Sequence, residues 1–212
     1  MHMSAITVWG DIRCPWCWMG RRRLAAALER VEREVTVVHR SFLLEPEGPQ
    51  SRDRTVRTAA LNSWGVSAER WEATRLRVAD AGRADGLAID MDGVLSIDSR
   101  PAHRLVKLAV ARGITPDRAW DRAFSGHLER HEDLADPATL RGIGTELGLD
   151  GSEVDSLLGS DRYADEVEDD HRAAVALGVG AVPAFLYEER LLSGARSVDE
   201  LVDLLNGAEA VR

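Results

Sequence analysis

The sequence contains very little cysteine: Cys14 and Cys17 are the only two, with Pro15 and Trp16 between them. A disulfide that served only as a staple would close a very short loop here, and short loops remove little entropy from the unfolded chain. The spacing therefore favours redox chemistry, in which one thiolate attacks a disulfide and its neighbour resolves the mixed intermediate.

Metal binding is the other common use of such a pair. Tetrahedral zinc needs about four ligands, and the sequence has no further cysteine to supply them. His127 and His131 are four residues apart on an expected helix, but their pattern lacks the glutamate of a His-Glu-x-x-His site. We interpret these two histidines as part of a solvated helix face and expect no metal.

Long apolar runs and excess basic charge are also missing. The longest uncharged run, residues 173–187, is too short for a membrane span and contains Gly178 and Pro183. No secretory leader is visible, because Asp11 interrupts the first apolar segment. A net charge of −9 argues against a nucleic-acid surface. We expect a cytoplasmic protein without membrane or nucleic-acid partners, and cytoplasmic disulfides are usually transient and catalytic.

The only basic triplet is Arg21-Arg22-Arg23, and acidic residues of the same expected helix dilute its charge. We interpret most of this cluster as a hydrated helix face. Arg21 stands four residues after Cys17, so it has a second interpretation: its guanidinium could lean toward the cysteines and favour a thiolate.

Two β-branched segments enclose the first expected helix. Residues 6–9 and 35–44 have strand character, and apolar residues between them recur at helical spacing after Cys14-Pro15. A strand, a helix and a second strand at this spacing predict a parallel βαβ unit.

The middle of the chain, residues 52–177, has an almost wholly helical pattern. Thr115-Pro116 and Asp136-Pro137 each combine a capping side chain with proline at the first helical position. Strand character returns at 184–187 and 191–192, before a capping box at Ser197 starts a final helix. We therefore predict an α/β fold in which a mixed βαβ…ββα sheet carries a large inserted helical domain. The domain that holds the sheet would be discontinuous and comprise residues 1–51 and 178–212. The inserted helical domain would comprise residues 52–177.

The cysteines stand where the first strand turns into the helix. With Pro15 in the first helical turn, Cys14 would lie at the N-cap, where the helix dipole, equivalent to roughly +0.5 charge, favours an anionic sulfur. We therefore assign Cys14 as the attacking sulfur and Cys17 as the buried resolving sulfur. Pro15 would stiffen the turn, and Trp16 would offer an apolar surface beside the sulfur. For Asp11 an ordinary turn role is favoured over proton transfer, and for Trp18 packing is favoured.

A second special segment lies at Val182-Pro183. Proline cannot donate to a sheet ladder, so it belongs at a strand start or edge, and Gly178, Gly180 and the X-Pro bond suggest an unusual backbone with a cis peptide. Placed opposite the cysteines, the Val182 backbone would pair with an extended thiol-containing substrate. An ordinary turn before a strand explains the same residues nearly as well.

Together these motifs resemble the FrnE-like branch of the DsbA family over nearly the whole chain. The resemblance implies a thioredoxin fold with a helical insertion, a cis-proline at Pro183 and dithiol–disulfide exchange through Cys14 and Cys17. His103 would either face the cleft from the helical domain or serve as a structural hydrogen-bonding residue. The segments that carry the resemblance are Cys14-Pro15-Trp16-Cys17, Phe42-Leu43-Leu44-Glu45-Pro46, Ala102-His103-Arg104-Leu105, Gly178-Val179-Gly180-Ala181-Val182-Pro183 and Gly194-Ala195.

Kappa-class glutathione transferases and 2-hydroxychromene-2-carboxylate isomerases share this architecture, so an enzyme that uses a low-molecular-weight thiol is the first alternative. Those enzymes typically carry serine in place of Cys14 and a Gly-x-Asp-Arg segment, whereas this chain has Gly194-Ala195-Arg196-Ser197. A non-enzymatic partner-binding module is the second alternative.

The leading hypothesis is a thiol–disulfide oxidoreductase that acts on a thiol- or disulfide-containing protein or small molecule. It would need no resident cofactor, although a low-molecular-weight thiol could be a co-substrate. Oxidation, reduction and isomerisation stay open, because the direction depends on the reduction potential. The sequence does not indicate an oligomeric state.

Overall fold

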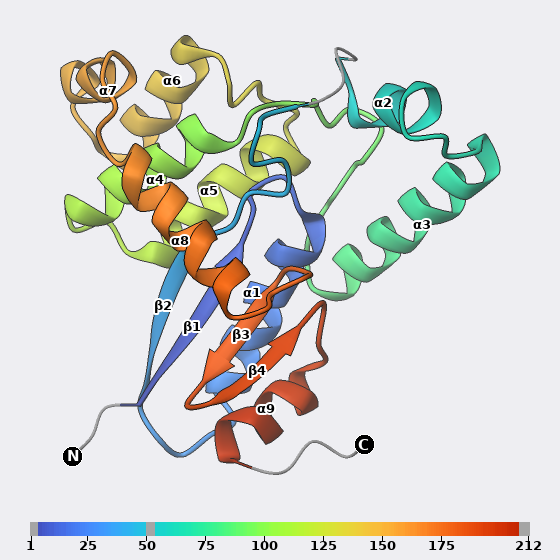
Figure 1. Cartoon of the computed structure of the whole chain (residues 1–212), viewed down its shortest axis with the longest axis vertical. Coiled ribbons are helices and arrows are strands. Elements are labelled where there is room, and N and C mark those ends of the chain that lie inside the picture. Colours follow the sequence, from blue (N-terminus) through green and yellow to red (C-terminus); the bar gives the residue numbers. More distant parts are fainter. Residues whose placement is uncertain (1–3, 50–53, 208–212) are drawn as a thin grey trace.

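A four-stranded mixed sheet organises the chain (Figure 1). The computed structural model describes residues 4–49 and 54–207. The strand order is β2-β1-β3-β4; β2 runs parallel to β1, and the other neighbouring pairs are antiparallel. This arrangement confirms the predicted α/β class with its βαβ and ββα parts. The strands are β1 (Ser4–Gly10), β2 (Val35–Ser41), β3 (Ala184–Tyr187) and β4 (Arg190–Ser193).

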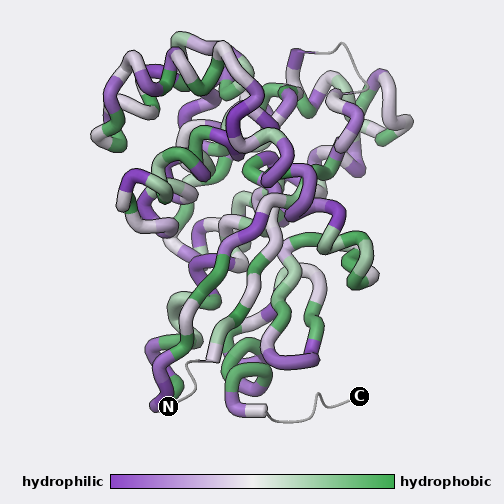
Figure 2. Tube along the Cα trace, turned by 60° about the vertical axis from the view of Figure 1, so that its left-hand side comes forward, coloured by the Kyte–Doolittle hydropathy of each residue, from purple (hydrophilic) through white to green (hydrophobic). Residues whose placement is uncertain are grey.

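Two helices belong directly to this sheet. Helix α1 (Pro15–Leu28) connects β1 to β2, and α9 (Val198–Asn206) follows β4. The predicted capping box of α9 is present: the Glu200 amide donates to the Ser197 hydroxyl, and the Ser197 amide donates to the Glu200 carboxylate. Hydrophobic residues recur along the strands and the final helix (Figure 2). Apolar side chains of both helices and the sheet share one core, which includes Ile6, Val8, Leu24, Phe185, Leu201 and Leu204.

Seven helices lie between β2 and β3 in the described part of the chain. Thr115 and Asp136 cap α5 and α6 with their side chains, as predicted, and Gly148 ends α6 in the left-handed region. The proposed boundary between residues 51 and 52 lies outside the described residues, and the boundary at 177/178 stays a prediction. The seven are α2 (Val56–Asn62), α3 (Ala68–Ala84), α4 (Arg100–Ala111), α5 (Pro116–Leu128), α6 (Pro137–Leu147), α7 (Gly151–Leu158) and α8 (Ala164–Ala176).

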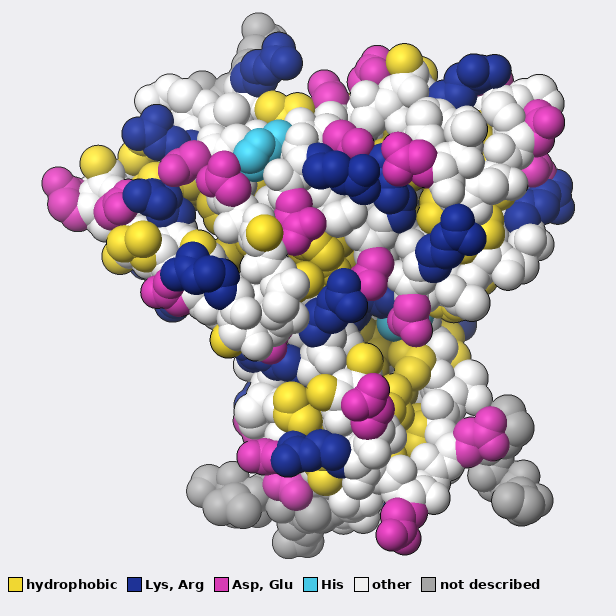
Figure 3. Space-filling view, turned by 180° about the vertical axis from the view of Figure 1, so that it is seen from behind, with side chains coloured by type: hydrophobic (Ala, Val, Ile, Leu, Met, Phe, Trp, Pro, Cys, Tyr) yellow, Lys and Arg dark blue, Asp and Glu magenta, His cyan; other side chains and the backbone are white. Residues whose placement is uncertain are grey.

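A second buried cluster extends from the helical part into the sheet part. Trp9, Ile12 and Trp18, from β1, its following turn and α1, belong to the same buried cluster as Trp120 and Phe124 of α5. In the space-filling view, hydrophobic side chains gather where the wide helical part meets the narrower sheet part (Figure 3). Within residues 4–49 and 54–207, no helix combines the length and apolar character that a bilayer crossing requires.

Strand β2 is shorter than the sequence predicts, because it ends at Ser41 rather than residue 44. The next three amides have other acceptors. Phe42 donates to the Gly10 carbonyl, and Leu43 and Leu44 donate to the side chains of His171 and Asp11. Because these two side chains replace strand partners as acceptors, the chain leaves the sheet here and passes over the turn that follows β1.

The arginine triplet is only in part the hydrated face that the sequence suggested, because the Arg22 side chain is 46% exposed whereas its two neighbours turn inward. The side chain of Arg21 is buried, and that of Arg23 is largely so. Each of the three arginines pairs with a carboxylate of the helical part. The pairs are Arg21–Asp117, Arg22–Asp121 and Arg23–Asp85.

A buried carboxylate joins β2 to two helices of the insertion. Asp170 of α8 accepts hydrogen bonds from the Arg40 guanidinium at 2.7 Å, the Ser41 amide at 3.0 Å and the Lys107 ammonium at 2.6 Å. Its backbone carbonyl also accepts from the Trp9 indole. A buried charge is tolerated when it is paired and hydrogen-bonded in this way, so Asp170 holds α4 and α8 against the sheet.

Candidate active site

The cysteine turn begins helix α1. Cys14 is the N-cap residue in extended conformation, and Pro15 is the first helical residue, as predicted. The Cys14 amide donates to the Asp11 carbonyl, and the Cys17 amide donates to the Cys14 carbonyl, both at 3.0 Å. The first turn of α1 carries no acidic residue, so the positive end of the helix dipole at Cys14 is not neutralised within the helix.

Both cysteines carry free thiols, and they differ in burial. Cys14 keeps 7% of its surface exposed, whereas Cys17 keeps 1%. Burial raises the pKa of Cys17 well above its usual value, and the neighbouring Cys14 sulfur raises it further. Cys14 is therefore the more accessible of the two residues, and burial favours the protonated form of Cys17.

The Val182-Pro183 segment lies against the cysteine turn although 168 residues separate Val182 from Cys14. The Val182-Pro183 peptide bond is cis, as expected. The Cys14 thiol donates a weak hydrogen bond to the Val182 carbonyl across 3.8 Å, and the Gly194 amide donates to the Pro183 carbonyl at 2.8 Å. The structure thus brings together the two motifs that the sequence placed far apart.

The two tryptophans of the turn have different surroundings. Trp16 is half-buried, and the Arg77 guanidinium of α3 lies over its ring, 5.5 Å from the centroid. Trp18 is buried, stacks on Phe124 and donates to Asp121, which confirms its packing role. Pro15 is buried at the start of the helix.

Asp11 and His103 form a buried pair beside the cysteine turn. Both are fully buried, and His103 Nε2 lies 3.5 Å from Asp11 Oδ1. The Asp11 carboxylate also accepts from the Arg13 and Leu44 amides, which confirms a turn role. Burial by itself would raise the pKa of Asp11, but the contact with His103 and these two amides lower it below its usual value. His103 also meets Trp120 edge-on; its predicted contact with substrate stays a prediction.

The interpretation of His127 as a solvated residue is wrong. Its ring is fully buried, because the residues around it on α5 belong to the core. His131 lies beyond the end of α5 and contacts the Asp90 carbonyl at 2.9 Å. Within the described residues, no group of three or more His, Cys, Asp or Glu side chains is arranged to hold a metal ion.

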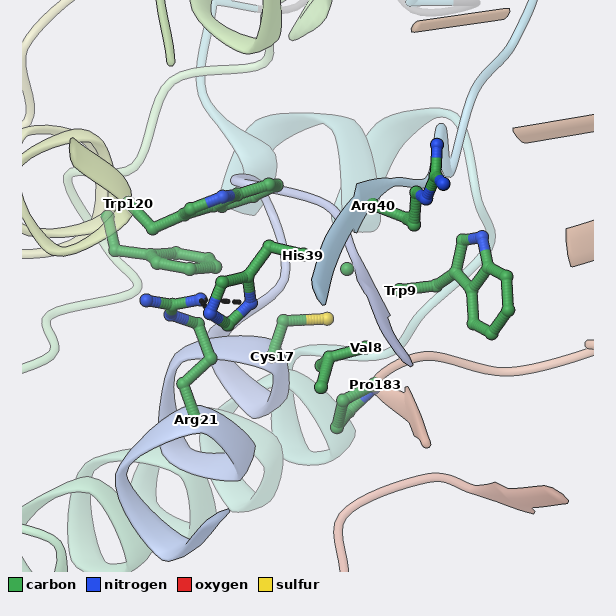
Figure 4. Close-up of a pocket in the computed structure, with 10 residues that line it drawn as sticks. Val8, Trp9, Cys17, Arg21, His39, Arg40, Trp120 and Pro183 are labelled. Carbon is green, nitrogen blue, oxygen red and sulfur yellow. Dashed lines mark hydrogen bonds between the residues drawn. The ribbon is translucent and has the colours of Figure 1, made fainter. Parts of the chain in front are cut away.

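Two further residues at the site have no signal in the sequence. His39 of β2 lies beside Cys17 in a close-up of a small cavity (Figure 4), together with Arg21 and Trp120. Gly20 of α1 faces the Pro183 ring. Neither residue belongs to a recognisable motif, because their importance arises only when distant segments meet.

Replacing Gly20 with alanine is expected to destabilise the protein by about 1–3 kcal/mol, because overpacking a core displaces its neighbours. A Cβ at this position would lie 2.6 Å from Pro183 Cγ and 3.2 Å from Phe185 Cζ. Denaturant unfolding measures the loss. Gly142→Ala is the matched control, since a Cβ there meets nothing within 4 Å; equal stability of the two variants would contradict the prediction.

Comparison with known proteins identifies a matching family and structures of the same fold. The family model of the DSBA-like thioredoxin domain matches residues 5–206. No curated protein matches the sequence significantly. A structure described as a probable DsbA oxidoreductase from Streptomyces coelicolor is similar with a TM-score of 0.90 and 32% identity, over 99% of this chain and 91% of that chain.

More distant structures share the fold. The cytosolic disulfide reductase DsbM from Pseudomonas aeruginosa with GSH has a TM-score of 0.62 and 21% identity, over 96% of this chain and 98% of that one. A 2-hydroxychromene-2-carboxylate isomerase has a TM-score of 0.68 and 14% identity, over 96% of this chain and 93% of that one. With the matched family model, the sheet and the cysteine turn, the chain belongs to the DSBA-like thioredoxin domain family.

Proposed function

We propose that the protein is a thiol–disulfide oxidoreductase that exchanges disulfides through Cys14 and Cys17. The observation that carries the proposal is the unequal burial of the two cysteines. Both are free thiols at the start of one helix, yet Cys14 is 7% exposed and Cys17 is 1% exposed. A redox pair needs one accessible nucleophile and one protected resolving sulfur. A purely structural pair needs no such asymmetry.

Reduction of a substrate disulfide proceeds in two balanced steps. The Cys14 thiolate attacks one substrate sulfur, a mixed disulfide forms, and the first substrate thiolate leaves and takes a proton from water. Cys17 then loses its proton and attacks Cys14 Sγ, which releases the second substrate thiolate. Two electrons pass from the enzyme dithiol to the substrate. The reverse sequence oxidises a substrate dithiol, and the potential of the Cys14/Cys17 pair sets the direction.

The surroundings of Cys14 are suited to an extended substrate. The Val182 carbonyl already lies within reach of the Cys14 sulfur, and the Val182 backbone would pair with the substrate chain beside the reacting disulfide. Pro15, Trp16 and Pro183 would supply the apolar contacts around it. The substrate class is a protein or small molecule that contains a thiol or disulfide.

A low-molecular-weight thiol is a reasonable co-substrate. The related reductase DsbM is described as cytosolic and was solved with GSH, which supports the same compartment and thiol class for this chain. We retain the FrnE-like assignment as part of the proposal. An isomerase that uses a bound thiol, as the shared fold with the 2-hydroxychromene-2-carboxylate isomerase suggests, would not require Cys17, and a partner-binding module would require neither cysteine.

Capture of the mixed disulfide tests the proposal. Cys17→Ser, mixed with glutathione disulfide, is expected to accumulate a stable glutathione adduct on Cys14, because the resolving sulfur is gone. Intact-mass measurement detects the adduct, and thiol reductant should remove it. The matched control, Cys14→Ser, should form little adduct, because burial and a raised pKa keep Cys17 protonated. Absence of the adduct in Cys17→Ser, or equal adducts in both variants, would refute the proposal.

A further inference from the structure

An exposed cation lies beside the cysteine turn. Helix α3 of the helical part packs against α1 (Figure 1), and the guanidinium carbon of Arg77 on α3 is 5.5 Å from the centroid of the Trp16 ring. Trp16 stands between Cys14 and Cys17 in the chain and is half-buried, whereas Arg77 is exposed. Because a cation is attracted to the face of an indole, the ring holds a positive charge next to the cysteine turn.

Arg77 has no carboxylate partner, unlike other arginines of its helix. Arg75 pairs with Glu72, and Arg83 pairs with Asp80. Within residues 4–49 and 54–207, no carboxylate forms an ion pair with Arg77, and its recorded contact is the one with the Trp16 ring. A guanidinium carries five N–H donors in a fork that matches the two oxygens of a carboxylate. These donors are available to an anionic group of a bound molecule.

The carboxylates around the cysteine turn are already engaged. Asp11 is fully buried against His103, and Glu45 forms an ion pair with Arg13. The first turn of α1 carries no acidic residue. The whole chain has a net charge of −9, but charges in solution are screened beyond about 8 Å at physiological ionic strength. A substrate group bound at the turn is therefore affected by the nearby guanidinium more than by distant acidic residues.

We propose that Arg77 binds a carboxylate of the disulfide substrate and thereby selects anionic disulfides for attack by Cys14; this rests on the proposed exchange function. The substrate class is a disulfide that carries a carboxylate near its sulfur atoms. The ion pair between this carboxylate and the guanidinium positions the substrate, and the electrons still pass between the sulfur atoms alone. Arg77 is thus a specificity-determining residue that the helical insertion contributes to the site.

Three small disulfides of different charge test this role. Glutathione disulfide is anionic, hydroxyethyl disulfide is neutral and cystamine is cationic. In a Cys17→Ser background, intact-mass measurement after rapid quenching gives the rate of adduct formation on Cys14 for each of them. The rate with Arg77→Gln is then divided by the rate with Arg77 for the same disulfide, so the intrinsic reactivity of each disulfide cancels.

Arg77→Gln is expected to lower the rate with glutathione disulfide about threefold to tenfold, the scale of a charge-assisted pair at a partly exposed site. The rate with the neutral disulfide should stay the same, and the rate with cystamine should rise. Arg77→Lys should retain most of the preference, because it keeps the charge, and Arg77→Glu should reverse it. The difference between Arg77 and Arg77→Gln should fade as salt approaches about 1 M, where screening is nearly complete.

Arg83→Gln is the matched control, because it removes the same charge from the same helix at a residue that pairs with Asp80. It should leave all three rates unchanged. Unaltered rates in Arg77→Gln, or an equal change with all three disulfides, would overturn the assignment of Arg77, since neither depends on substrate charge. If none of the three disulfides reacts with the Cys17→Ser protein, the exchange function itself is overturned instead.

A pair of disulfide-linked peptides identifies the source of the carboxylate. One peptide carries aspartate beside its cysteine and the other carries lysine. A loss with Arg77→Gln for the aspartate peptide as well as for glutathione disulfide would assign acidic protein segments to the substrate class. A loss confined to glutathione disulfide would assign low-molecular-weight disulfides.

Discussion

Replacing Cys14 with serine is expected to lower turnover of glutathione disulfide by at least about a thousandfold, the scale seen when an enzyme loses its nucleophile. A serine hydroxyl stays protonated at neutral pH and cannot form a disulfide with substrate. Cys17 cannot take over, because it is 1% exposed and burial raises its pKa well above the usual value. The measurement is steady-state turnover coupled to an external reductant.

The control for this experiment is structural. The Cys14 thiol makes a weak hydrogen bond to the Val182 carbonyl, so serine should leave the circular dichroism spectrum and the unfolding midpoint nearly unchanged. Loss of turnover in a folded protein would then be a loss of chemistry. Turnover within about tenfold of the parent protein would contradict the assignment of Cys14 as nucleophile.

Acid is expected to destabilise the protein strongly through two buried histidines. Burial lowers the pKa of both His39 and His127 to about 4, whereas in the unfolded chain each has the ordinary value of about 6.5. The unfolded state therefore binds more protons between these values, so the free energy of unfolding decreases as pH falls from about 6.5 toward 4. Each histidine contributes at most about 3 kcal/mol to this loss.

His127→Leu isolates one of the two contributions. The ring nitrogens of His127 have no hydrogen-bond partner within the described residues, so an apolar side chain of similar size should cost little at neutral pH. Urea unfolding at several pH values should show about half the pH dependence of the parent protein in the window between about pH 4.5 and pH 6.5. The carboxylates affect both proteins alike there. A slope equal to that of the parent would show that His127 does not titrate on unfolding.

Local signals were sufficient for much of the fold. Proline after a capping residue predicted the starts of α5 and α6, and Ser197 with Glu200 predicted the start of α9. These predictions succeeded because caps and turns depend on residues within one helical turn of each other. The end of β2 was wrong by three residues, since the amides of Leu43 and Leu44 bind side chains from distant parts of the chain.

The sequence by itself determined the cysteine turn: two cysteines at a helix start, with the first at the N-cap, followed from residue types and their spacing alone. It also marked Val182-Pro183 as a segment of unusual backbone, but its spacing alone did not choose between a place opposite the cysteines and an ordinary turn. Only the tertiary structure decided which charged and aromatic groups surround the inner sulfur. His127 looked like a surface residue because helical periodicity reports one face of a helix, not what a second layer packs against the other. For Arg21 the spacing left two interpretations, a hydrated face and a position near the cysteines, and the fold buries it in the lining of the cavity beside Cys17. Burial, and with it the pKa of His39, His127 and Cys17, depends on packing between elements that lie far apart in the chain.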